Sequence, residues 1–129
     1  MGDKTMNKEA IDAWLIARDL DKDSGEYLDY SWAVDMLYDQ ACDHPAELLT
    51  SVINILDADS TPETMGALGA GPIEDLFLHH GSDCINEIER IARSNPKFKG
   101  CLLFTFLDED DVSKDVYVRL QKIKSSDKK

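Results

Sequence analysis

Apolar residues recur at helical spacing along almost the whole chain. Ile11, Trp14 and Leu15 stand at positions i, i+3 and i+4, and Asn7 before them suits the N-cap of a helix. A second segment, from about Ser24 to Cys42, also places its apolar side chains on one face. This period predicts helices in both segments.

Three prolines divide the remainder of the chain into further helices. Pro45, Pro72 and Pro96 each precede an apolar helical pattern, and proline is tolerated in the first turn of a helix. The unit of helix, proline and helix around Asp43-His44-Pro45 recurs 51 residues later around Ser94-Asn95-Pro96. Such units bury their apolar faces by stacking, which favours antiparallel αα-hairpins.

Cap residues mark two further helix boundaries. Ser60-Thr61-Pro62-Glu63 has the spacing of a capping box, in which Ser60 caps the helix and Glu63 reaches back to it. Gly81 predicts the end of the helix that begins at Pro72. Ser82 then predicts the cap of a separate helix.

Short apolar runs near the C-terminus fit two kinds of secondary structure. Residues 101–107 and 116–120 read either as helices or as the strands of a hairpin. The repeated helix–proline–helix unit favours helix over residues 97–107. We therefore expect an all-α single domain over residues 1–124, with seven or eight helices in stacked antiparallel αα-hairpins like a short helical solenoid. Residues 125–129 are expected to form a frayed tail.

Strong acidity narrows the classes of partner. The 129 residues include 26 Asp and Glu against 14 Lys and Arg, a net charge of −12. Residues 1–111 hold 24 of the acidic side chains and 8 of the basic ones, so the body is more acidic than the whole. An acidic body repels nucleic acid and anionic lipid and attracts basic protein surfaces. We expect a protein partner, no nucleic acid and no membrane, with simple solubility as the alternative explanation.

No segment predicts membrane insertion or export. No apolar run approaches the roughly 20 residues that span a bilayer, and the charged start has no apolar stretch behind it. Cys42, Cys84 and Cys101 are scattered without a Cys-x-x-Cys pair, so free, buried thiols are expected. A cytoplasmic location follows as an expectation, and the sequence leaves the oligomeric state open.

One helical face gathers acidic residues without interleaved cations. Asp35, Asp39 and Asp43 lie at i, i+4 and i+8, and Glu47 follows just past the turn. Like charges at this spacing cost an isolated helix about 0.2–0.5 kcal/mol per pair. A stripe that destabilises its own helix is a candidate for binding a basic surface, and a merely solvated face is the alternative. These four carboxylates are the candidate partner-binding residues.

A second cluster carries metal-binding or acid–base chemistry. It consists of Glu74, Asp75, His79 and His80. Asp75 and His79 are four residues apart and can meet on one helical face, whereas His80 points elsewhere. The alternative is a surface pair near a helix C-terminus, where histidine suits the helix dipole. We assign no metal and no cofactor.

Cofactor-binding and catalytic motifs are incomplete or absent. The run Asp19–Gly25 has the ligand spacing of a calcium loop, but Ser24 replaces the required glycine and Tyr30 replaces the bidentate glutamate. No nucleophile motif is present. A non-enzymatic role is expected, although the many carboxylates leave an acid/base pair open.

A central block, residues 68–76, resembles a known family. The chain resembles an uncharacterised bacterial domain family whose members share such a block and a following histidine-glycine pair: here Leu68-Gly69-Ala70-Gly71-Pro72-Ile73-Glu74-Asp75-Leu76, then His80-Gly81. The resemblance covers most of the chain and implies a helical fold and a bacterial origin, with no established activity. Its matching polar positions are Glu74, Asp75 and His80.

Three functions are consistent with these patterns. The first is an acidic binding protein that neutralises or regulates a basic protein partner, most sharply an immunity protein against a bacterial toxin domain. The second is a helical-repeat adaptor that binds a peptide in a groove between hairpins. The third is a metal-binding or hydrolytic protein centred on Glu74, Asp75, His79 and His80. Small size, acidity and the lack of catalytic motifs favour the first.

Overall fold

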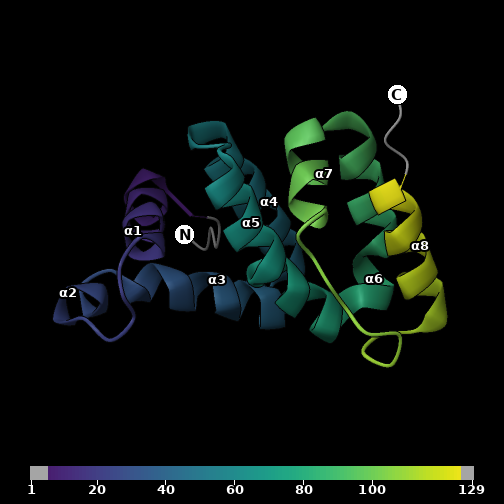
Figure 1. Ribbon diagram of the computed structural model, residues 1–129, viewed down its shortest axis with the longest axis horizontal. Coiled ribbons are helices and arrows are strands. Elements are labelled where there is room, and N and C mark those ends of the chain that lie inside the picture. Colours follow the sequence, from purple (N-terminus) through teal and green to yellow (C-terminus); the bar gives the residue numbers. More distant parts are fainter. Residues whose placement is uncertain (1–5, 126–129) are drawn as a thin grey trace.

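Eight helices form the regular secondary structure of the computed structural model, which describes residues 6–125 (Figure 1). They are α1 (Lys8–Arg18), α2 (Gly25–Leu28), α3 (Ser31–Asp43), α4 (Pro45–Ala58), α5 (Pro62–Ala70), α6 (Pro72–Ser94), α7 (Pro96–Leu102) and α8 (Lys114–Ser125). The prediction of an all-α single domain with seven or eight helices is confirmed. Ser125, where the frayed tail was expected to begin, ends α8, and residues 126–129 lie outside the described residues.

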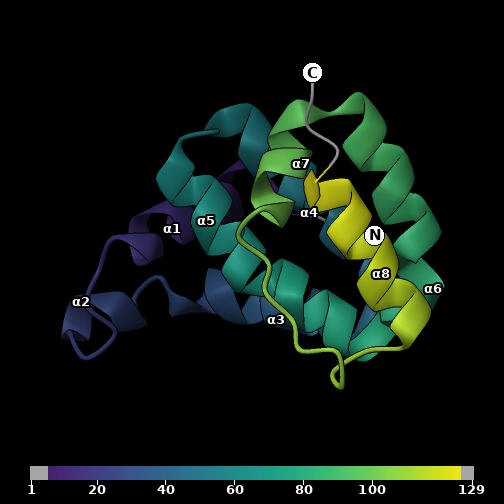
Figure 2. The ribbon, with the colours of Figure 1, turned by 45° about the vertical axis from the view of Figure 1, so that its right-hand side comes forward.

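Helix α6 is the longest helix and lies at the centre of the packing. It contacts α3, α4, α5, α7 and α8, and most consecutive helices also pack on one another. Helix α3 runs along the lower edge of the molecule in both ribbon views (Figures 1 and 2). The largest fully buried side chains come from α3 to α7 and form one core: Leu37, Leu48, Ile55, Leu56, Leu68, Ile73, Leu76, Phe77, Ile85, Ile88, Phe98 and Leu102.

Several predicted helix boundaries are confirmed. The Asn7 side chain caps α1 by accepting a hydrogen bond from the Ala10 N–H at 2.9 Å. His44 and Asn95 leave the helical conformation directly before their prolines, with φ/ψ of −140°/66° and −134°/96°. Proline disfavours the helical conformation in the residue before it. The repeated helix–proline–helix unit therefore corresponds to the α3–α4 and α6–α7 pairs.

Two predicted boundaries in the first half of the chain are wrong. The segment from Ser24 to Cys42 is not one helix, because Tyr30 has φ/ψ of −121°/−7° and separates α2 from α3. Thr61, not Ser60, caps α5, since the Thr61 hydroxyl accepts a hydrogen bond from the Thr64 N–H. The cap thus stands directly before the proline that begins the helix.

The break predicted at Gly81 and Ser82 lies one residue earlier, at His80, where two helical segments meet at a kink. Helix α6 continues through both residues, and its kink falls at His80, with φ/ψ of −141°/24°. Gly81 is buried against α8, where an added Cβ would lie 3.4 Å from the Val116 side chain. That distance is an ordinary van der Waals contact, so packing against α8 does not require glycine at this position.

Residues 97–107 are helical only to the end of α7, so the helix predicted for the rest of this run is wrong. Residues 103–113 instead run down from α7 and turn back into α8 (Figures 1 and 2). The buried Thr105 hydroxyl donates to the Gly69 carbonyl at 2.7 Å, and Lys124 donates to the Thr105 carbonyl at 2.7 Å. These tertiary contacts override the local helical pattern.

Helix α8 belongs to the core, and residues 116–120 are helical. Its Val116 and Leu120 side chains are buried. Next to them on the same helix, Arg119 Nε donates to the Glu89 carboxylate of α6 at 3.0 Å, and this contact lowers the pKa of Glu89. The basic C-terminal segment therefore neutralises part of the acidic body.

Glycine at position 69 allows α5 and α7 to pack closely. A Cβ atom added there would lie 2.0 Å from the Cys101 carbonyl oxygen, far inside van der Waals contact. The obstacle is backbone at the end of α7, so no side-chain rotation relieves it. This part of the central block is structural.

We predict that Gly69→Ala destabilises the fold by about 2 kcal/mol or more, because overpacking typically costs about 1–3 kcal/mol. Gly25→Ala is the matched control, since a Cβ there meets no atom within 4 Å. Urea unfolding of both variants measures the difference. Equal unfolding midpoints for the two variants would contradict the close α5–α7 contact.

Candidate functional site

The acidic stripe, Asp35, Asp39 and Asp43, occupies successive turns of α3, and all three side chains are exposed. The opposite face of the helix is buried through two alanines and Leu37. Within residues 6–125, none of the ion pairs includes these carboxylates. The stripe therefore faces outward without a direct cationic partner in that range.

Glu47 does not extend the stripe along the same helix. It lies in the first turn of α4 and is half-buried. The chain turns at His44, so the spacing within α3 no longer fixes the position of Glu47. A carboxylate in a first turn is also favoured by the helix dipole, which accounts for this residue locally.

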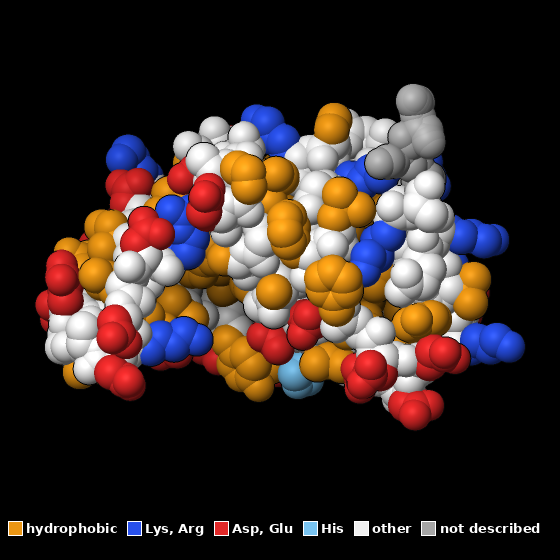
Figure 3. All heavy atoms as spheres, in the orientation of Figure 1, with side chains coloured by type: hydrophobic (Ala, Val, Ile, Leu, Met, Phe, Trp, Pro, Cys, Tyr) orange, Lys and Arg blue, Asp and Glu red, His pale blue; other side chains and the backbone are white. Residues whose placement is uncertain are grey.

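Beside the stripe is a cleft of about 440 Å³, on the face of the molecule shown in Figure 3. Its walls come from the end of α1, the following loop, α2, α3 and the α5–α6 junction. Aromatic and charged side chains line it together: Trp14, Arg18, Lys22, Tyr27, Asp35, Tyr38 and Asp75. Asp35 therefore belongs both to the stripe and to the cleft.

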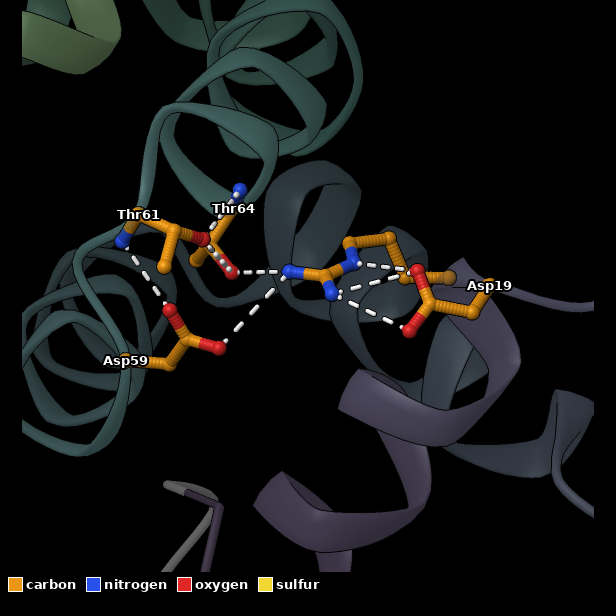
Figure 4. Close-up of polar contacts among 5 residues, drawn as sticks. Asp19, Asp59, Thr61 and Thr64 are labelled. Atoms are coloured by element: carbon orange, nitrogen blue, oxygen red, sulfur yellow. Dashed lines mark hydrogen bonds and ion pairs between the residues drawn. The ribbon is translucent and has the colours of Figure 1, made fainter.

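Arg18 lines the cleft and is held by a polar network (Figure 4). Its guanidinium donates to both carboxylate oxygens of Asp19 at 3.1 Å, and also to the Thr64 hydroxyl. It lies 3.8 Å from the carboxylate of Asp59, whose pKa is lowered first by the hydrogen bond from the Thr61 N–H. The network joins the end of α1 to the start of α5 and balances the Arg18 charge.

We predict that Arg18→Ala destabilises the fold by about 1–2 kcal/mol, because hydrogen bonds from a charged donor contribute about that much when partly shielded from water. The Arg18 side chain is 17% exposed. Arg90→Ala is the control, since Arg90 pairs with Glu87 on the exposed surface of α6 and should matter little. Thermal unfolding compares them, and equal losses would contradict a structural role for the network.

The structure divides the predicted cluster of Glu74, Asp75, His79 and His80. Glu74 accepts the Phe106 N–H at 3.3 Å. Asp75 lines the cleft, where burial raises the pKa of its carboxyl and His79 lowers it to a smaller extent. Both histidines reach the end of α3 instead. The metal-binding or hydrolytic hypothesis requires the four side chains to converge on one centre. In the structure they do not.

Both histidines contact Cys42 near the end of α3. The His80 Nε2 lies 2.6 Å from the Cys42 carbonyl oxygen and donates to it. The His79 Nδ1 lies 2.9 Å from the Asp75 carbonyl oxygen, and its Nε2 lies 3.6 Å from Cys42 Sγ. Asp75 and His79 do meet on one helical face, but the hydrogen bond uses the Asp75 backbone rather than its carboxylate. Cys42 is half-buried, which corrects the expectation that all three cysteines are buried, and all three are free thiols.

Two features are not found in the described part of the chain. Over residues 6–125, no group of three or more His, Cys, Asp or Glu side chains is arranged to hold a metal ion. No helix in that range combines the length and hydropathy needed to cross a bilayer.

Sequence spacing does not predict the cleft, because its walls come from distant parts of the chain. Trp14 and Tyr27 lie far in sequence from Asp75, and only tertiary packing brings them together. The signal available in the sequence is the central block, since its Gly71, Pro72 and Asp75 line the cleft. In the central block, Gly69 therefore allows close helix packing, and Gly71, Pro72 and Asp75 line the cleft.

Comparison with known proteins identifies the family but no characterised relative. Residues 20–128 match the family described as "Family of unknown function (DUF6869)", and the chain belongs to this family. No curated protein matches the chain, and no solved structure matches it. The expectation of an uncharacterised domain family is confirmed.

Proposed function

We propose that this chain is a cytoplasmic binding domain that neutralises or regulates a basic protein partner through the acidic stripe of α3 and the cleft beside it. The sharpest form of the proposal is an immunity protein that binds a bacterial toxin domain, such as a nuclease. Enzymes that act on nucleic acid carry cationic surfaces, which an acidic inhibitor can cover.

The observation that carries the proposal is a line of three exposed carboxylates without a direct ion pair among residues 6–125. Side chains at i, i+4 and i+8 extend along roughly 12 Å of helix, which suits a cationic surface better than a single ion. The carboxylate of Glu89 differs from those of the stripe, because it is paired within the chain with Arg119 of α8. Complementary charge of this kind raises association rate and specificity more than affinity.

The cleft supplies an anchoring place that a purely charged surface lacks. Interface hot spots are often arginine or aromatic side chains held in pockets shielded from water. Tyr27 and Tyr38 offer aromatic surface in the cleft, and Asp35 and Asp75 place carboxylates beside them. Arg18 and Lys22 line the same cleft, and the Asp19 and Asp59 carboxylates balance Arg18. An arginine side chain of the partner would therefore meet two carboxylates and one cation, Lys22, together with the aromatic rings.

We predict that reversing the stripe, with Asp35→Lys, Asp39→Lys and Asp43→Lys together, lowers the association rate for the partner about 10- to 1000-fold at low salt. The change removes electrostatic steering and replaces it with repulsion. The partner is first captured from the host cell at low salt and purified, and surface plasmon resonance then measures the rates for both chains.

The matched control is the triple reversal Asp57→Lys, Glu109→Lys and Asp110→Lys, which changes the net charge equally at exposed positions on other elements. It should retain binding, and wild-type binding should weaken as salt rises. In the immunity form, the captured partner is toxic when expressed alone and harmless beside the wild-type chain. The proposal would be contradicted if the stripe reversal left the association rate unchanged. It would also be contradicted if the affinity of the wild-type chain did not depend on salt concentration.

The cleft also favours a second candidate function, an adaptor that binds a peptide segment. Ligand sites are commonly hollows of about 300–1,000 Å³ with apolar walls and a few placed polar groups. The cleft here has about 440 Å³ and aromatic walls, enough for a few side chains of a peptide. In such an adaptor, apolar contact rather than charge carries the affinity.

For this adaptor, we predict that Tyr27→Ala lowers peptide affinity about tenfold, as truncation of an interface hot spot does, while wild-type binding persists at high salt. Tyr117→Ala in α8, away from the cleft, is the control. Isothermal titration calorimetry with fragments of the captured partner measures both variants. Binding kept in Tyr27→Ala but lost in the stripe reversal would assign recognition to the charged surface alone.

A further inference from the structure

The charged side chains that line the cleft come from different walls. Arg18 ends α1 and Lys22 follows in the loop, toward the α2 end of the molecule (Figures 1 and 2). Asp35 comes from α3, and Asp75 comes from the first turn of α6. Among the described residues, the lining holds two cations and two carboxylates, although the whole chain has a net charge of −12. The cleft is therefore not a simple continuation of the acidic surface.

Three of these four charges are unpaired among residues 6–125. None of the ion pairs in that range includes Lys22, Asp35 or Asp75. The Asp75 carboxylate also accepts no hydrogen bond in that range, although its side chain is half-buried. Arg18, in contrast, is already paired. Opposite charges thus line one cleft without meeting each other, which leaves both for a ligand that carries two charges.

Apolar and aromatic side chains complete the lining. Trp14 and Ala17 of α1, Tyr27 of α2 and Tyr38 of α3 belong to it. A guanidinium is attracted to the faces of aromatic rings, and its planar fork of N–H groups matches carboxylates. The stem of an arginine side chain is apolar and packs on apolar surface. Arginine therefore suits the aromatic and carboxylate part of the lining.

We propose that the cleft binds the C-terminal arginine of a peptide chain. The guanidinium pairs with Asp35 and Asp75, and the terminal carboxylate pairs with Lys22. An internal arginine leaves Lys22 as a repelling cation, whereas a terminal carboxylate makes the same charge attractive. Capture of a chain end through its carboxylate is a known mode of peptide recognition. The inference rests on the proposed use of the cleft for recognition, and it adds which part of the partner enters.

The surroundings of Lys22 set the size of this effect. Asp21 and Asp23 flank it in the loop and weaken its attraction for a carboxylate. Neither lines the cleft, and the Asp21 carboxylate accepts the Asp23 N–H at 2.9 Å. Because Lys22 is exposed, its contribution should equal that of a surface ion pair. We therefore expect a free carboxylate to strengthen binding about threefold to fivefold.

The experiment compares two acetylated tetrapeptides, each with three alanines and a final arginine, that end in a carboxylate or in a carboxamide. Nuclear magnetic resonance titration of the labelled full chain at low salt measures both affinities. General attraction by the acidic chain favours the amide, which has one more positive charge. Tighter binding of the acid therefore reports a local cation, and it is the expected result. Equal affinities, tighter binding of the amide, or no binding of either peptide overturns the proposal.

Lys22→Gln tests the contact with the terminal carboxylate. This variant should lose the preference for the acid peptide. Lys114→Gln, which removes an exposed lysine of α8 outside the cleft, is the matched control and should keep the preference. A preference that persists in Lys22→Gln, or that is lost in both variants, overturns the role of Lys22. The stripe reversal is scored by the association rate of the whole partner, so it can succeed where this peptide test fails.

Asp75→Asn tests the contact with the guanidinium. It should weaken both peptides about tenfold, because hydrogen bonds to a charged group are lost, and it should leave their ratio unchanged. Circular dichroism confirms that the variant is folded. Free L-arginine, whose α-ammonium would lie beside Lys22, should bind more weakly than the acid peptide. Unchanged affinity in Asp75→Asn overturns the guanidinium contact, and tighter binding of free arginine overturns the assignment to a chain end.

Discussion

The packing of α3 against α6 brings Asp35 and Asp75 to one cleft and both histidines of α6 to the end of α3. It is fixed at one end by the hydrogen bond from His80 to the Cys42 carbonyl, at the kink of α6. A shift of α3 by one turn, about 5.4 Å, would carry Asp35 out of the cleft and separate Cys42 from His79. The constraint is thus the register between two helices rather than the chemistry of one residue.

The distribution of ion pairs follows from the same architecture. A net charge of −12 opposes compaction through self-repulsion. The positions of the few cationic side chains therefore decide where this repulsion is relieved. Arg18 joins α1 to the start of α5, and Arg119 joins α8 to α6. Both are used at junctions between helices. Helix α3 receives no such pairing within residues 6–125, which leaves its carboxylates for an external surface.

Local signals predicted much of the fold, and tertiary contacts decided the rest. The breaks before Pro45 and Pro96 are steric effects on neighbouring residues, so sequence alone reveals them. The extended segment after α7 depends on the contact of Thr105 with Gly69, which no local pattern encodes. The stripe was predictable because helical period places its residues on one face. The cleft and the Cys42–His79 contact were not, since the two residues are 37 positions apart on different helices.

The burial of α8 bears on how the chain folds during synthesis. Val116 and Leu120 fill the core, and Lys124 holds the Thr105 carbonyl beside the α5–α7 contact. Helices α1 to α7 therefore leave the ribosome before the element that completes their apolar surface. Because α8 packs on α6 and α7, apolar side chains of these two helices stay uncovered until α8 is in place. The apolar surfaces of α6 and α7 that α8 covers are therefore complete only after residues 114–125 have been synthesised.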